Sequence, residues 1–143
     1  MGVFLLGPAA PSVVGLPVYT YRIPAGFPSP AQDHTEGPIS LDELMDLRAP
    51  HMYLARAAGH SMVGVGIGDG DILVIDRSRL PEPGQVVIAA LNGEPLVKIY
   101  DIQQGQTILR SANSAYPPRY LLEGDELAVW GVVRYSIRSH EHY

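Results

Sequence analysis

Residues 85–100, QVVIAALNGEPLVKIY, contain two apolar runs separated by the dipeptide Asn92-Gly93. The runs are rich in Val, Ile and Leu, which favour β-strands. Asn-Gly is typical of a two-residue type I′ turn, because both turn residues need a positive φ. The segment therefore predicts a β-hairpin that joins a strand over 86–91 to a strand over 94–100.

The same pattern continues on both sides of this hairpin. Runs of β-prone residues bounded by Gly, Pro, Asn or Asp predict strands over residues 52–58, 71–76, 85–91, 94–101, 106–110 and 126–137. One segment differs: in Ser40-Leu41-Asp42-Glu43, a serine followed three residues later by Glu has the form of a capping box. It predicts one short helix over about 41–48 that Pro50 ends. The fold predicted is mostly β, with one short helix.

Residues 1–38 are organised differently from the rest of the chain. They hold seven prolines and five glycines and show neither a helical nor a sustained strand period. Such proline density disfavours helices and central strands alike. We predict an extended, mobile N-terminal arm over 1–38, with a β-prone centre at 16–21 that can pair at an edge, and a β domain over 39–143.

Composition excludes several classes of protein. The 143 residues carry 10 Lys+Arg against 15 Asp+Glu, a net charge of −5, and no basic run, which argues against direct DNA binding. With no cysteine there is no disulfide, thiolate nucleophile or cysteine zinc site. The apolar run 3–6 is broken by Gly7 and Pro8, and no later run approaches the ~18 residues of a membrane span. We expect one compact cytoplasmic domain without a membrane segment.

Ser61 is the first candidate for chemistry. It follows the predicted strand 52–58 and precedes Gly64, Gly66, Gly68 and Gly70. A serine at the end of a strand, beside backbone that turns sharply, can expose its hydroxyl and offer nearby N–H groups to an oxyanion. Most Gly-x-Ser segments are ordinary turns, so this pattern alone leaves that alternative open.

A serine nucleophile needs a base, and two residues are candidates. Lys98 lies inside a predicted strand and shares a face with Leu96 and Tyr100. If that face is buried, desolvation lowers the lysine pKa and makes the amine a base, whereas on an exposed edge its ammonium stays in water. His60 has Asp69, Asp71 and Asp76 near it in sequence, but adjacent residues of an extended chain point to opposite faces, which disfavours a His60–Ser61 bond.

A metal site is a weaker possibility. His140 and His142 lie two positions apart and could share a strand face, but no third ligand is nearby in sequence. We expect a solvated tail, no metal and no cofactor.

Six ordered motifs resemble those of the LexA-like self-cleaving serine peptidases, the S24 peptidases, and within them the UmuD-type proteins of SOS mutagenesis. The resemblance covers residues 16–138. The motifs are AGFPSPAxD at 25–33, GHSM at 59–62, GDGD at 68–71, VK at 97–98, NSAY at 113–116 and VWGVV at 129–133.

This resemblance implies a LexA/signal-peptidase-like β-sheet peptidase domain and a role for each matching residue. Ser61 is implied as the nucleophile, Lys98 as its general base, and the N–H groups of Ser61 and Met62 as the oxyanion site. The scissile bond is implied at Ala25-Gly26, and the departing arm would be residues 1–25. Small residues there suit a narrow cleft, and the chain from Gly26 to Ser61 is long enough for cleavage within one chain or across a dimer.

The resemblance also implies partners. A RecA filament on single-stranded DNA would promote self-cleavage, and the trimmed homodimer would serve a UmuC-type translesion DNA polymerase subunit. LexA-type repressors have a DNA-reading domain before the cleavage site, and with 25 residues before Gly26 we expect none here. Signal peptidases share the Ser–Lys pair but carry membrane segments. Residues before Pro17 match nothing in the family, and Ala25 stands where some relatives have Cys. The alternative from another class is a non-catalytic β scaffold that docks a partner through its arm.

Overall fold

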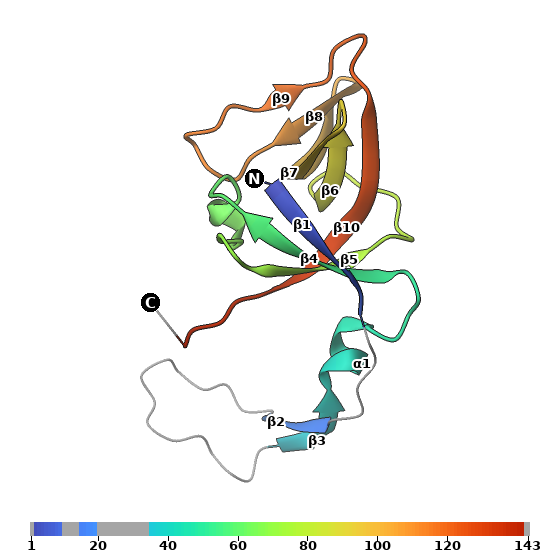
Figure 1. Ribbon diagram of the computed structural model, residues 1–143, viewed down its shortest axis with the longest axis vertical. Coiled ribbons are helices and arrows are strands. Elements are labelled where there is room, and N and C mark those ends of the chain that lie inside the picture. The colour runs from blue at the N-terminus through green and yellow to red at the C-terminus, as the bar shows by residue number, and fades with distance from the viewer. Residues whose placement is uncertain (1, 10–14, 20–34, 142–143) are drawn as a thin grey trace. The chain divides into compact units, whose positions relative to one another are not determined.

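The computed structural model of the protein describes residues 2–9, 15–19 and 35–141 (Figure 1). The chain forms two compact units. One contains Met1–Ala9 and Pro50–Tyr143, and the other contains Ala10–Ala49.

The larger unit is an eight-stranded antiparallel sheet in the order β1-β4-β5-β10-β6-β7-β8-β9 (Figure 1). Its strands are β1 (Gly2–Pro8), β4 (Met52–Ala58), β5 (Ile72–Asp76), β6 (Val86–Leu91), β7 (Glu94–Gln103), β8 (Gln106–Arg110), β9 (Arg119–Tyr120) and β10 (Leu127–Ile137). Six of these match the runs predicted from sequence, so the mostly β fold is confirmed. The two-residue strand β9 was not predicted.

Two hairpins connect β6, β7 and β8. Asn92 and Gly93 have φ of 51° and 83°, as a type I′ turn requires, and Leu91 pairs with Glu94. The predicted hairpin is therefore confirmed. Gln104 and Gly105 repeat this geometry, with φ of 52° and 77°, between β7 and β8.

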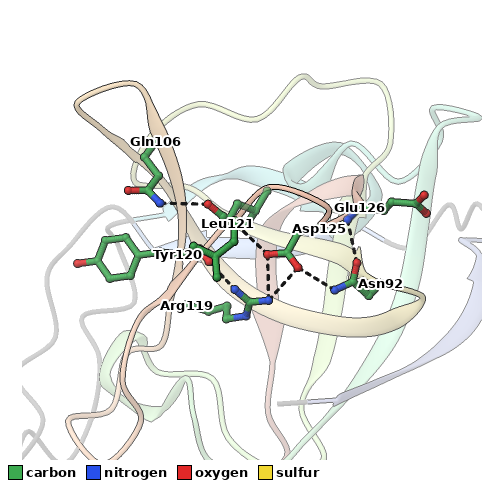
Figure 2. A network of polar contacts seen from close by, with 8 residues as sticks. Asn92, Gln106, Arg119, Tyr120, Leu121, Asp125 and Glu126 are labelled. Carbon is green, nitrogen blue, oxygen red and sulfur yellow. Dashed lines mark hydrogen bonds and ion pairs between the residues drawn. The ribbon is translucent and has the colours of Figure 1, made fainter.

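The first hairpin turn is also tied to the loop that leads into β10 (Figure 2). The side chain of Asn92 accepts the N–H of Glu126 at 2.8 Å and donates to Asp125 at 3.1 Å. Arg119 in turn donates to Asp125 at 3.0 Å. This network holds the turn, β9 and the start of β10 together.

β10 joins the two halves of the sheet. Its first part, Leu127–Val132, pairs with β6, and its second part, Val132–Ile137, pairs with β5. A Cβ on Gly131 would lie 2.5 Å from Ile75 Cγ2, so only glycine allows this close approach.

One hydrophobic core is formed by residues of the strands on either side of the candidate site. Its buried members come from β4, β5, β6, β7 and the segment between β4 and β5: Ala55, Ala57, Met62, Ile67, Leu73, Ile75, Ile88, Val97 and Ile99.

β1 differs from the predicted arm. Residues 2–8 pair with β4, with Gly2 opposite Ala58, and Val3 packs against the core. Val3 also lines an apolar cavity of about 260 Å³ together with Ala55, Ile88 and Trp130. A Gly- and Pro-containing segment pairs here because it lies at a sheet edge, where proline is tolerated.

The smaller unit contains a two-stranded sheet and one helix. β2 (Gly15–Tyr19) pairs with β3 (Thr35–Ser40), and α1 (Leu41–Met45) follows directly. Ser40 caps α1 by accepting the N–H of Asp42 at 3.0 Å. The predicted helix end is wrong, because Asp46 adopts a left-handed conformation with φ of 57° and ends α1 well before Pro50.

Candidate active site

Ser61 lies in a tightly bonded turn after β4. The N–H of Gly59 donates to Asp69 Oδ1 at 2.8 Å, and the N–H of Gly70 donates to the carbonyl of Ala57 at 2.8 Å. Met62 is fully buried in the core, which anchors the next position. The turn therefore holds Ser61 at a defined place beyond the end of β4.

The hydroxyl of Ser61 is not exposed. The sequence predicted an exposed side chain, but Ser61 is only 1% exposed, so that expectation is wrong. Its neighbour Met62 packs in the core, and a local pattern of glycines does not reveal that contact.

Lys98 is the single lysine of the sequence and lies on β7. Its neighbours Val97 and Ile99 belong to the core, whereas Lys98 lies on the other face together with Leu96 and Tyr100, as predicted. The structure decides between the two alternatives, because this face is half-buried. The Nζ atom lies 3.2 Å from Ser61 Oγ. The structure thus brings together the two residues, 37 positions apart, that the family resemblance pairs.

The environment of the amine destabilises its charged form. Burial lowers the pKa of Lys98 from its usual value, and the carboxylate of Glu94 acts in the opposite direction with a smaller effect. A neutral amine has a lone pair that can accept the hydroxyl proton, which an ammonium lacks. The pair therefore has the composition of a base and a nucleophile.

Ser111 also touches the amine, and sequence reasoning missed it. Its Oγ lies 2.8 Å from Lys98 Nζ. Ile99 pairs with Arg110 across β7 and β8, so Ser111 stands one step further along the same register, opposite Lys98. A two-residue hairpin turn at Gln104-Gly105 was the signal that could have located it.

The backbone of the turn supplies unused donors. The N–H groups of Val63, Gly64, Val65, Gly66 and Ile67 all donate to carbonyl groups. Within residues 2–9, 15–19 and 35–141, no acceptor binds the N–H of Ser61 or Met62. These two N–H groups, predicted as an oxyanion site, therefore have no hydrogen-bond acceptor among the described residues, although both residues are buried.

His60 is not arranged as a base. Its side chain is exposed, and in the described part of the chain no hydrogen bond joins its imidazole to Ser61. Asp69 accepts Gly59, and Asp71 pairs with Arg138 at 2.9 Å. Asp76 contacts Arg79 at 3.1 Å. Each of these three carboxylates therefore contacts a group other than the His60 imidazole.

The structure describes only some of the remaining residues that the sequence singled out. Ala25 and Gly26 lie outside the described residues, as does His142. Among the residues that the structure describes, no group of three potential metal ligands occurs. No helix in that part of the chain is long and apolar enough to cross a membrane.

Comparison with known proteins identifies the family. Residues 17–134 match the Peptidase S24-like family. SamA of Salmonella typhimurium is 39% identical over 82% of this chain and 81% of its own length. MucA of Escherichia coli is 35% identical over 92% and 90%, and the LexA repressor of Leptospira interrogans is 35% identical over 72% and 54%. The chain therefore belongs to the Peptidase S24-like family of SOS-related, self-cleaving serine peptidases, as a LexA-like protein of the UmuD type.

Proposed function

We propose that this protein cleaves its own chain between Ala25 and Gly26, with Ser61 as the nucleophile and Lys98 as the general base. The observation that carries the proposal is the 3.2 Å separation between Lys98 Nζ and Ser61 Oγ, together with the lowered pKa of the amine. Activating a serine hydroxyl requires a base within hydrogen-bond distance, and a lowered pKa moves that base toward its neutral form at the working pH.

The chemistry uses only groups of this chain and one water molecule. Lys98 takes the proton of Ser61 Oγ while Oγ attacks the carbonyl carbon of Ala25. The resulting oxyanion accepts hydrogen bonds from the N–H groups of Ser61 and Met62. The C–N bond then breaks, and Lys98 returns the proton to the amine of Gly26. Water, deprotonated by Lys98, then attacks the ester carbonyl of Ala25. The bond between that carbonyl carbon and Ser61 Oγ breaks, residues 1–25 leave as a carboxylate, and Lys98 returns its proton to Ser61 Oγ.

Burial of Ser61 gives this reaction a conformational requirement. Because Ser61 is 1% exposed, the cleavage segment can enter only from a minor conformation in which the site is open. A RecA filament on single-stranded DNA would raise the rate by binding that conformation preferentially. The trimmed homodimer would then act in the cytoplasm as accessory subunit of a UmuC-type translesion polymerase, without a cofactor, metal, membrane or direct DNA contact.

The burial of Ser61 also favours a second candidate function. In a non-catalytic β scaffold that docks a partner through its arm, the nucleophile stays covered and the Ser–Lys pair is idle. The two functions differ in one product, since only the peptidase yields a fragment that begins at Gly26.

The test is self-cleavage of purified protein from about pH 7 to pH 10, followed by mass spectrometry, with Ser61→Ala and Lys98→Ala as controls. The wild-type rate should rise with pH as Lys98 loses its proton, and it should level off at a pH below 10.5, the usual lysine pKa, because burial lowers the pKa of this amine. Both variants should lose at least roughly 10²-fold in rate. A flat pH profile, or cleavage that survives Lys98→Ala, contradicts the proposed mechanism.

A further inference from the structure

We propose that Ser111 is a positioning residue that holds the Lys98 amine in line with the Ser61 hydroxyl. The inference rests on the proposed self-cleavage and adds a third side chain to its machinery. Ser111 acts through Lys98 and does not touch the reacting peptide.

The first support is the geometry around the amine. Lys98 Nζ lies 2.8 Å from Ser111 Oγ and 3.2 Å from Ser61 Oγ, so it sits between two hydroxyl groups. A lysine side chain has four flexible carbon–carbon bonds, and its head group otherwise turns toward water. The shorter contact to Ser111 fixes the position of Nζ, and the contact to Ser61 is then available for proton transfer.

The second support is that one hydroxyl can serve both protonation states. A neutral amine donates an N–H to Ser111 Oγ and keeps its lone pair for the proton of Ser61. After proton transfer the ammonium still donates to Ser111 Oγ, now as a stronger, charge-assisted bond. Ser111 therefore stabilises the charged lysine that forms during the attack, without having to rotate away.

The third support is that the segment bearing Ser111 is bonded to the nucleophile turn. Gly64 N–H donates to the carbonyl of Ala112 at 2.6 Å, and the side chain of Asn113 donates to the carbonyl of His60 at 2.9 Å. Residues 111–113 thus contact the base through a side chain and the Ser61 turn through two hydrogen bonds. This arrangement sets the distance between base and nucleophile.

The proximity of Ser111 also raises the alternative that Ser111 itself is the nucleophile. Ser61 is favoured because its own N–H and that of Met62 donate to no described residue. An oxyanion needs such N–H donors close to the nucleophile. The variant Ser61→Ala separates the two roles, because cleavage would persist in it if Ser111 attacked the peptide.

The experiment uses the single lysine as a probe. Protein labelled with ¹³C at lysine Cε carries one side-chain lysine signal, whose titration by NMR reports the Lys98 amine whether or not the chain is cleaved. The variants are Ser111→Ala, Ser111→Thr, which keeps the hydroxyl, and Ser114→Ala, the same chemical change at an exposed position on the same segment.

Loss of a hydrogen bond to a charged group costs about 1.5–3 kcal/mol, which corresponds to roughly 10- to 150-fold in rate. We expect Ser111→Ala to lower the cleavage plateau by that factor and to move the lysine titration to lower pH, because the ammonium loses an acceptor. Ser111→Thr should retain most of both properties, and Ser114→Ala should match the wild type.

Each outcome decides a separate question. An unchanged rate and titration in Ser111→Ala overturns the role of Ser111, and so does a lower rate with an unchanged titration, which indicates a merely structural effect. If Ser61→Ala still cleaves, Ser111 is the nucleophile and the positioning role is rejected. If the wild type does not cleave at all, the proposed function fails, while the titration still shows whether Ser111 holds the amine.

Discussion

Gly64→Ala tests whether the Ser61 turn must dock against residues 111–113. A Cβ on Gly64 would lie 2.4 Å from the carbonyl oxygen of Ala112 and 3.1 Å from its carbonyl carbon. Both are backbone atoms, so no side-chain rotation relieves the contact. Restoring an ordinary separation of 3.4 Å requires the turn and the segment to move apart by about 1 Å.

The expected effects follow from that displacement. Overpacking of this kind costs about 1–3 kcal/mol, and the reduced freedom of the unfolded chain returns about 0.4–1 kcal/mol. We therefore expect a net loss of roughly 1–2 kcal/mol of stability and a fall in Tm of roughly 3–6 °C. Catalysis is more sensitive, since a displacement of about 1 Å between reacting groups costs on the order of 10²-fold in rate.

Gly68→Ala is the matched control. Its Cβ would also lie 2.4 Å from a neighbour, but that neighbour is the guanidinium end of Arg138, which can move. Thermal unfolding and self-cleavage of the two variants are measured side by side. Gly68→Ala should cleave within a few-fold of the wild type, whereas Gly64→Ala should be slow. If Gly64→Ala cleaves at the wild-type rate with an unchanged Tm, docking of the turn does not control the site.

Two further predictions concern stability and the sheet edge. Burial alone would raise the pKa of Asp71, but Arg138 and the N–H of Gly68 lower it overall below its usual value of 3.8, so its contribution to stability is present above that pH and is lost on further acidification. In urea unfolding, the stability gap between wild type and Asp71→Asn should therefore shrink below about pH 4, and a widening gap contradicts this assignment. Val3→Asp should detach β1 and speed hydrogen exchange of β4 amides at least about tenfold, because a carboxylate replaces a side chain packed on the core. Leu6→Asp, at a 50% exposed position of the same strand, should leave the exchange unchanged, and equal effects of both changes would refute the role of Val3.

Local sequence predicted most of the sheet because its strands and turns depend on neighbouring residues. The hairpin around Asn92-Gly93 has the predicted register, and β4 and β8 have the predicted bounds. The start of α1 was likewise readable from the capping residue Ser40. Its end was not, because Asp46 takes a left-handed conformation that glycine usually supplies.

Elements that depend on distant partners were not predicted. β1 pairs with β4 across about 50 positions of chain, and nothing within residues 2–8 reveals that this edge is open to them. The two-residue β9 is too short to leave a periodic pattern, and forms only because β8 lies beside it.

The candidate site was likewise predicted in part from local sequence and decided in part by tertiary structure. Ser61 and Lys98 were named from sequence through motifs that resemble the family, and the alternation along β7 predicted that Lys98 shares a face with Leu96 and Tyr100, but not whether that face is buried. Tertiary structure alone decided that the two atoms lie 3.2 Å apart, that Ser61 is covered, and that Ser111 reaches the same amine. The physical reason is that β4 and β7 are separated by three strands in the sheet, so this contact depends on how the whole sheet curves and packs.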